Sequence, residues 1–172
     1  MSTEQDLQRA KEQARAQLDG IVSMAKRLKH CDECDGSDPE QCGLTDQELA
    51  DGLDEYWEGG AVLDDEERED YRTRYHDKEQ ASESIDEDPL SVEVRGGWHT
   101  PGEDNEMVEY TILLCTGGPA CRIIGDLSEH NEPDSARLEY QDWFTPWTKF
   151  FDFKDDEEDL LLTYAQHFYY GE

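Results

Sequence analysis

The sequence has few basic residues and no long apolar run. The chain of 172 residues contains 15 Lys and Arg against 45 Asp and Glu, which gives a formal net charge of −30. Charge of this sign repels nucleic acids and anionic lipids, so we expect direct binding to neither. Because no run of about 20 apolar residues is present, the sequence also predicts no transmembrane helix.

Signals for export and for common enzymes are also missing. The first residues, MSTEQDLQRAKEQ, lack the apolar core of a secretory signal, so we expect a cytoplasmic protein. In that reducing compartment the five cysteines would stay free or bind a metal. No Walker A motif, G-x-G-x-x-G or G-x-S-x-G occurs. We therefore expect neither an enzyme nor an organic cofactor.

Aromatic residues nevertheless indicate a folded core beneath the acidic surface. The chain has 4 Trp, 8 Tyr and 5 Phe, too many for a disordered acidic tail. The charge is uneven along the chain. Residues 1–30 hold 6 basic and 4 acidic residues, residues 31–90 hold 4 and 23, and residues 91–172 hold 5 and 18. The acidity is therefore concentrated in the middle third.

Helical periodicity dominates the first half of the chain. Apolar residues at three- and four-residue steps predict an amphipathic helix over residues 3–29. Its alanine-rich stripe would pack in the core or form a homodimer seam. A cysteine-containing loop is expected over 30–43. Two acidic helices are expected over 45–58, opened by a Thr45–Glu48 capping box, and over 64–82.

The period changes to that of strands in the second half. Strands are predicted over residues 91–98, 109–116, 120–127 and 136–143, and a closing helix over 155–170. The sequence therefore predicts an α+β fold with an antiparallel meander sheet of about four strands. We expect two regions, an acidic helical region over 1–88 and a sheet module over 89–172.

Cysteine and histidine residues in the loop suggest a structural zinc site. His30, Cys31, Cys34 and Cys42 offer the soft ligands that zinc prefers, and the C-x2-C spacing is typical of a zinc knuckle. The alternatives are reduced loop cysteines or a disulfide. The other two cysteines, Cys115 and Cys121, flank a hairpin turn and are expected to be small buried residues.

One aromatic cluster could anchor a protein partner. Trp143, Phe144 and Trp147 lie within a single short motif. Such residues either pack in the core and turns or stand exposed as binding anchors.

The acidic helices suggest mimicry of nucleic acid. Carboxylates at helical spacing form rows on one face, and 30 charges correspond to about 50 Å of duplex DNA. We expect the phosphate-mimicking residues to be Asp46, Glu48, Asp51, Asp54, Glu55, Glu58, Asp64, Asp65, Glu66, Glu67, Glu69, Asp70, Asp77 and Glu79.

Three stretches of the second half resemble small proteins of bacterial phages and mobile elements. They are VRGGWHTPG over residues 94–102, YTILLCTGGPA over 110–120 and LEYQDWFTPW over 138–147. The resemblance implies a shared sheet module. In character, though not in sequence, the acidic half is similar to DNA-mimicking antirestriction and anti-CRISPR proteins.

The leading hypothesis is therefore a non-enzymatic inhibitor of a host defence system. Its partner would be a protein with a basic nucleic-acid-binding groove, such as a CRISPR effector complex or a restriction enzyme. The alternatives are an acidic, chaperone-like protein for basic partners and a halophile-type acidic domain with a zinc-stabilised loop.

Overall fold

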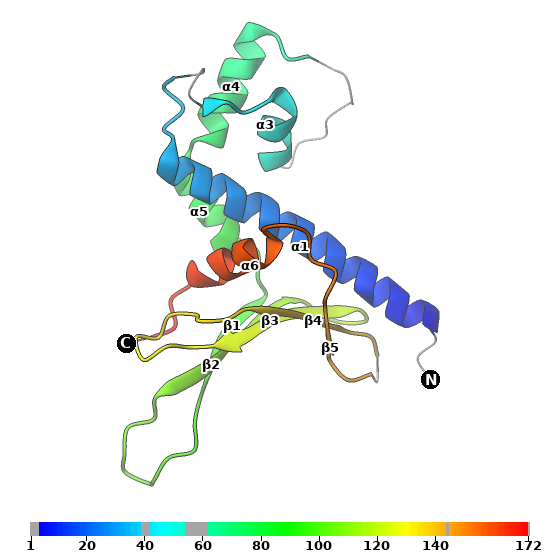
Figure 1. Ribbon diagram of the computed structural model, residues 1–172, viewed down its shortest axis with the longest axis vertical. Coiled ribbons are helices and arrows are strands. Elements are labelled where there is room, and N and C mark those ends of the chain that lie inside the picture. Colours follow the sequence, from blue (N-terminus) through cyan, green and yellow to red (C-terminus); the bar gives the residue numbers. More distant parts are fainter. Residues whose placement is uncertain (1–3, 39–41, 54–61, 144, 172) are drawn as a thin grey trace. The chain divides into compact units, whose positions relative to one another are not determined.

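A computed structural model describes the chain apart from residues 1–3, 39–41, 54–61, 144 and 172. The fold is α+β, as predicted, with five antiparallel strands rather than about four (Figure 1). The helices are α1 (Glu4–Glu33), α3 (Asp46–Gly52), α4 (Asp65–Tyr75), α5 (Lys78–Glu87) and α6 (Glu157–Gln166). The strands are β1 (Ser91–Gly96), β2 (Met107–Cys115), β3 (Ala120–Asp126), β4 (Arg137–Gln141) and β5 (Thr148–Lys149). None of the described helices is long and apolar enough to cross a membrane.

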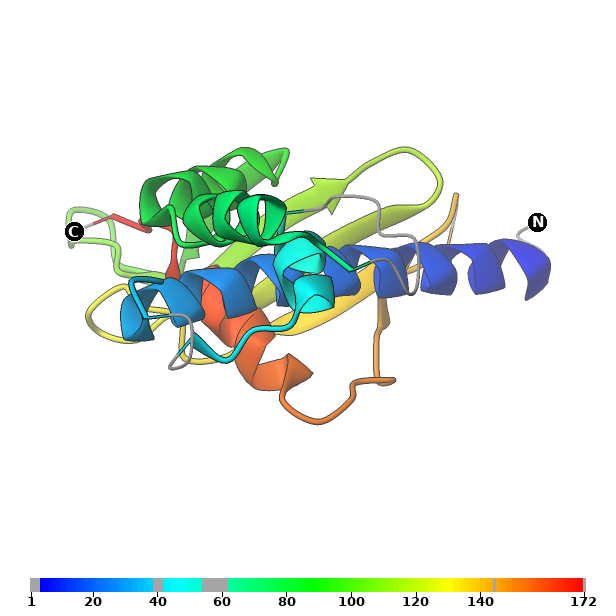
Figure 2. The same cartoon turned by 90° about the horizontal axis from the view of Figure 1, so that it is seen from above.

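Contacts divide the chain into two compact units. The sheet unit comprises residues 1–22 and 86–172, and the helical unit comprises residues 23–85. This division differs from the expected boundary at residue 88, because the first 22 residues belong with the sheet. Helix α1 is continuous, so it contributes residues to both units (Figure 2).

The sheet unit is a meander covered by α6. Its strands follow the order β1-β2-β3-β4-β5, so each strand pairs with its neighbour in sequence. Ile112, Ile123 and Leu138 lie opposite one another on three adjacent strands, and all three are fully buried. Leu161 and Tyr164 of α6 are buried in the same unit. The strand alternation in the sequence thus produced one apolar face.

The apolar stripe of α1 is buried within the chain. Ala10, Ala14 and Leu18 have no exposed surface. On the same helix, Arg15 donates a hydrogen bond of 2.8 Å to Glu157 at the start of α6. These residues of the stripe therefore pack in the core and are not available to a second copy of the chain. The homodimer itself stays a prediction.

The helical unit consists of short helices with defined ends. The expected capping box of Thr45 and Glu48 opens α3, and a second one, formed by Asp64 and Glu67, opens α4. The helix predicted over 64–82 is wrong in one respect, because it breaks after Tyr75 and restarts as α5. Part of the reason is that Asp77 accepts a hydrogen bond from the backbone N–H of Gln80, which favours a new helix start. Helix α5 also continues to Glu87, five residues beyond the predicted end at residue 82.

Few large apolar side chains are buried in the helical unit. Among its described residues, the large buried ones are Leu49, Leu63, Tyr75 and Ile85. Buried Arg27 of α1 adds polar contacts, donating hydrogen bonds of 3.0 and 2.7 Å to the carbonyls of Tyr75 and Arg74. The described residues of this unit thus bury little apolar surface and make only a small hydrophobic contribution to its stability.

Candidate metal centre

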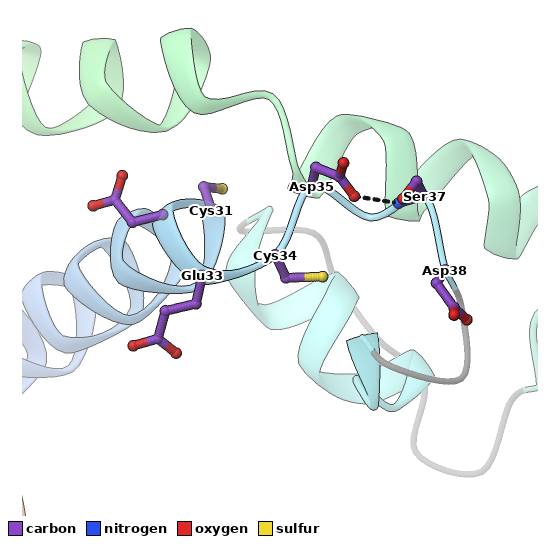
Figure 3. Close-up of a pocket in the computed structure, with 7 residues that line it drawn as sticks. Cys31, Glu33, Cys34, Asp35, Ser37 and Asp38 are labelled. Carbon is purple, nitrogen blue, oxygen red and sulfur yellow. Dashed lines mark hydrogen bonds between the residues drawn. The ribbon is translucent and has the colours of Figure 1, made fainter.

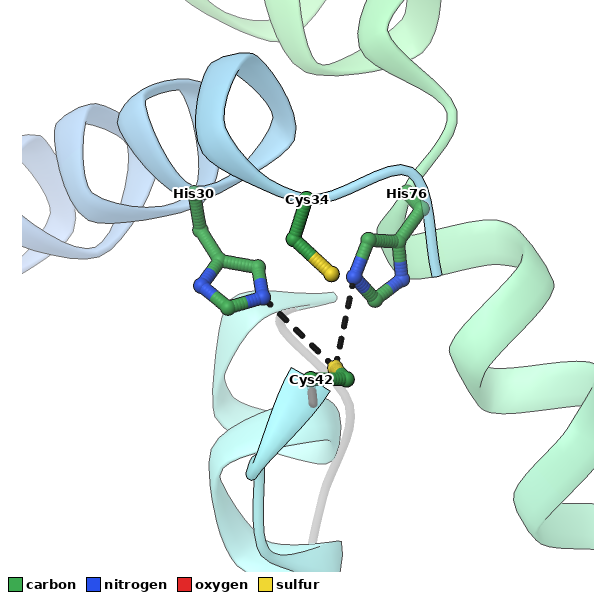
Figure 4. Close-up of side chains that lie close together, drawn as sticks. All are labelled: His30, Cys34, Cys42 and His76. Atoms are coloured by element: carbon green, nitrogen blue, oxygen red, sulfur yellow. Dashed lines mark hydrogen bonds between the residues drawn. The ribbon is translucent and has the colours of Figure 1, made fainter. Parts of the chain in front are cut away.

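Four side chains of the helical unit converge on one point. They are His30, Cys34, Cys42 and His76, and their ligand atoms all lie within 4.8 Å of one another. Figure 4 shows the two imidazole rings and the two thiols directed toward a common centre. The cluster could hold a metal ion.

The end of α1 positions the first two residues. The backbone N–H of Cys34 donates a hydrogen bond of 2.8 Å to the carbonyl of His30, which continues the helical pattern by one residue. A spacing of four residues therefore places His30 and Cys34 on one face. Cys31 follows His30 directly and points elsewhere, with its Sγ 3.3 Å from the carbonyl oxygen of Tyr75. The sequence prediction of Cys31 as a ligand is thus corrected.

His76 takes the place that Cys31 was expected to fill. It is the C-cap residue of α4, and its Nδ1 lies 2.7 Å from the carbonyl oxygen of Arg72. Because a carbonyl oxygen only accepts hydrogen bonds, Nδ1 is the donor in this contact. Nε2 is then the nitrogen that could bind a metal ion. Sequence reasoning missed His76 because it lay inside a helix predicted to be continuous. No local sequence pattern marks this position, because the break after Tyr75 is visible only in the structure.

Distances around Cys42 define the geometry of the cluster. Its Sγ lies 3.4 Å from Nε2 of His76 and 3.6 Å from Nε2 of His30 (dashed in Figure 4). The backbone N–H of Gly36 also points at the Sγ of Cys34, at 3.4 Å. This contact helps to orient the Cys34 sulfur within the cluster.

Burial shifts the pKa values of two cluster residues, Cys42 and His30. Cys42 is 8% exposed, and burial raises the pKa of its thiol. Burial, followed by the neighbouring His76, lowers the pKa of His30, so this imidazole is neutral at pH 7. Neutral imidazoles are the form that binds metals. A divalent cation would offset the cost of ionising a buried thiol.

An open cavity adjoins the centre. It has a volume of about 520 Å³ and is lined by residues 31–35, 37 and 38 (Figure 3). Cys34 belongs to both the cluster and the cavity wall, and its side chain is partly exposed. One face of the centre is therefore open to small solutes.

Several of the predicted phosphate mimics have structural roles instead. Glu48, Asp64 and Glu67 cap helices, and Asp46 accepts hydrogen bonds of 2.7 and 3.0 Å from Arg68. The hydrogen bond from Arg68 lowers the pKa of Asp46. These carboxylates already accept hydrogen bonds from groups of the same chain. Asp54, Glu55 and Glu58 lie outside the described residues.

Exposed carboxylates remain on the first two turns of α4. Asp65, Glu66, Glu69 and Asp70 are all exposed, and the pairs 65/69 and 66/70 lie one helical turn apart. Arginines follow in the last turn of α4, so the acidic row is shorter than predicted. Of the remaining candidates, Asp51 accepts a hydrogen bond from Gln47, Asp77 caps the start of α5, and Glu79 lies exposed in the first turn of α5.

The predicted aromatic anchor divides into packed and exposed parts. Arg122 stacks on Trp147 at 4.2 Å from the ring centroid. Trp143 is 59% exposed, and Phe144 lies outside the described residues. Among the aromatic residues that the structure describes, Trp98, just beyond β1, is the most exposed, and no anchor role was predicted for it. Exposure of that kind cannot be read from residue type alone.

The remaining two cysteines lie opposite each other on the strands of the β2–β3 hairpin. Cys115 and Cys121 are register partners on β2 and β3. Cys121 is fully buried, and burial raises the pKa of its thiol. It is thus a small core residue, as expected.

Comparisons of the chain with protein-family models, with curated proteins and with solved structures find no match.

Proposed function

We propose that this protein is a non-enzymatic acidic inhibitor whose helical unit is held together by a zinc ion. It would bind the basic nucleic-acid-binding surface of a host defence protein, such as a CRISPR effector complex or a restriction enzyme. The observation that carries the proposal is the His30–Cys34–Cys42–His76 cluster in the most acidic part of the chain.

Ligand chemistry and spacing favour zinc. Two thiolates and two imidazoles form a common structural zinc set, and carboxylate-preferring cations such as Ca²⁺ would find no oxygen ligand in it. Zinc binds sulfur at about 2.3 Å and nitrogen at about 2.0–2.1 Å, so a tetrahedral site separates sulfur from nitrogen by about 3.5 Å. The distances of 3.4 and 3.6 Å around Cys42 agree with that value.

Metal binding would also explain how so acidic a unit stays folded. Residues 23–85 carry 20 acidic and 7 basic residues, and like charges repel one another in a compact state. The small buried apolar area offsets little of that repulsion. A structural zinc site supplies folding free energy directly, because the unfolded chain has no preformed site.

Exposed charge supports the inhibitor role. A rigid row of carboxylates attracts basic surfaces that evolved to bind phosphates. The first two turns of α4 present such a row, and the resemblance of the second half to phage proteins points to the same biological setting.

Zinc content is the first test. Protein purified without added metal and without chelators should contain a single zinc ion per chain by mass spectrometry. His76→Ala should lose the zinc, because it removes a ligand. Cys31→Ser should keep it, since Cys31 is adjacent to His30 in sequence but lies outside the cluster. A metal-free wild type, or equal loss in both variants, would contradict the proposed site.

Charge reversal on α4 tests the inhibitor role. The variant carries Lys at Asp65, Glu66, Glu69 and Asp70, which leaves both capping boxes intact. A control variant carries Lys at four exposed residues of the sheet unit, Glu103, Asp104, Glu106 and Glu129. Both variants change the net charge equally.

The readout is phage plating on cells that carry one CRISPR or restriction system. Wild type and the control should protect the phage, and the α4 variant should not. Circular dichroism confirms that each variant is folded. If a folded α4 variant still protects, the groove-mimic proposal fails. If both variants fail equally, net charge alone matters and the protein is a general binder of basic partners.

A further inference from the structure

We propose that Cys34 and Cys42 form a disulfide when they react with a hydroperoxide, and that this reaction releases the metal. The inference rests on the zinc site proposed above and adds a way in which that site is regulated.

Unequal exposure of the two thiols sets the order of events. Cys42 is buried, whereas Cys34 is partly exposed and forms part of the wall of the open cavity. Figure 3 shows the Cys34 sulfur on the cavity side of the chain. A small oxidant in the cavity therefore reaches Cys34 first. Cys42 is then the resolving thiol, since its Sγ lies within 4.8 Å of that of Cys34.

The chemistry balances with hydrogen peroxide as the oxidant. The Cys34 thiolate attacks one peroxide oxygen, the O–O bond breaks, and hydroxide leaves to give a sulfenic acid at Cys34. The Cys42 thiolate then attacks the Cys34 sulfur, the S–O bond breaks, and a second hydroxide leaves. The two thiolates together lose two electrons, which reduce the peroxide to two hydroxide ions.

Loss of both sulfur ligands removes the metal. The two remaining imidazoles, those of His30 and His76, do not make a structural zinc site, which needs four ligands. The new disulfide also lies wholly within the segment 34–42. It cannot replace the link that the metal makes to His76 at the end of α4. Oxidation would therefore remove the metal's link between the end of α1 and α4, which carries the exposed carboxylate row, while the hydrogen bonds from Arg27 to Tyr75 and Arg74 still connect the two helices.

Cys31 serves as an internal control for this reaction. It is close to Cys34 in sequence and lines the same cavity, but its thiol contacts the carbonyl of Tyr75 instead of the cluster. That contact holds the Cys31 sulfur away from the cluster. A disulfide that includes Cys31 is not expected.

The experiment uses the full-length protein with its zinc content measured beforehand. Hydrogen peroxide is added, released zinc is followed with a chromogenic chelator, and disulfides are mapped by mass spectrometry. We expect complete zinc release with a Cys34–Cys42 disulfide, and recovery of zinc binding after dithiothreitol and added zinc. Cys31→Ser should behave as wild type.

A second variant separates metal loss from disulfide formation. Cys34→His keeps four zinc ligands but has no partner for Cys42, so it should retain zinc at peroxide doses that empty the wild type. Zinc retained by wild type, or zinc lost with only sulfinic or sulfonic acids at Cys34, would overturn the inference. If the starting protein holds no zinc, the proposed metal site itself fails, and that result is known before oxidant is added.

Discussion

At the scale of single residues, Gly36 determines how closely the chain can approach the His30–Cys34–Cys42–His76 cluster. Its φ of +74° lies in the left-handed region that favours glycine. A Cβ at this position would lie 2.7 Å from the imidazole ring of His76. Gly36 thus allows the loop after α1 to pass beside His76, while the N–H of Gly36 faces the sulfur of Cys34.

We predict that Gly36→Ala weakens zinc binding by about 10- to 100-fold, as changes to the surroundings of metal ligands do. The added methyl group must displace His76, and the backbone strain adds about 1–3 kcal/mol to the cost. Competition with a zinc chelator measures the affinity. Gly102→Ala is the control, because Gly102 also has a positive φ but open space around it. Equal zinc affinity in both variants would contradict this account.

Residue types predicted three of the four cluster members. His30, Cys34 and Cys42 were predicted because their side chains are the soft ligands that zinc prefers and they lie close together in the sequence. Cys31 was included wrongly, since adjacent residues of a helix point about 100° apart. His76 was missed because its position depends on where α4 ends and how it packs, which no local pattern encodes.

At the scale of elements, an ion pair connects α1 to α6 within the sheet unit. Arg15 of α1 binds Glu157, and the same carboxylate accepts a hydrogen bond of 2.8 Å from the N–H of Lys154. The side chain of Glu157 is only 9% exposed. The hydrogen bond from Arg15 is the largest cause that lowers the pKa of Glu157 below its usual value of 4.5.

This pair should make α6 docking sensitive to acid. Because the folded pKa is lowered, the stabilisation is complete above pH 4.5 and is lost as the pH falls through the folded pKa. We predict that Glu157→Gln reduces the free energy of unfolding by about 2 kcal/mol at pH 7. Urea unfolding at several pH values measures the difference, which should shrink below pH 4.5. A difference that is independent of pH would show that the charge of Glu157 is irrelevant. Exposed Glu158→Gln provides the control.

Sequence periodicity predicted the elements better than their boundaries. The long first helix, the four principal strands and the closing helix were all identified, because each repeats apolar residues at its own period. The break between α4 and α5 was not predicted, since charged residues fill the turn as readily as the helix. The short strand β5 has two residues and too little pattern to detect.

At the scale of the whole molecule, the net charge of −30 opposes compactness. Salt shortens the screening length from about 10 Å at 0.1 M to about 3 Å at 1 M. Repulsion between carboxylates of the same chain then weakens, while buried pairs such as Arg15–Glu157 are affected less.

We predict that 1 M sodium chloride raises the melting temperature by several degrees, because about 1 kcal/mol corresponds to about 2–4 °C in a chain of this size. Differential scanning calorimetry at 0.1 M and 1 M salt tests this. The α4 charge-reversal variant has a smaller net charge and should gain less. A melting temperature that falls with salt would mean that attractive ion pairs outweigh the repulsion.

The two units are completed at different times during synthesis of the chain. The helical unit is one continuous segment inserted into the sheet unit, so all four cluster residues have been made by residue 76. Arg15 and Glu157 are 142 residues apart. At a synthesis rate of about 5–20 residues per second, α1 leaves the ribosome about 10 s before α6 exists to cover its apolar stripe. During that interval the nascent chain would depend on chaperones, or on early capture of zinc, to keep its first helix from aggregating.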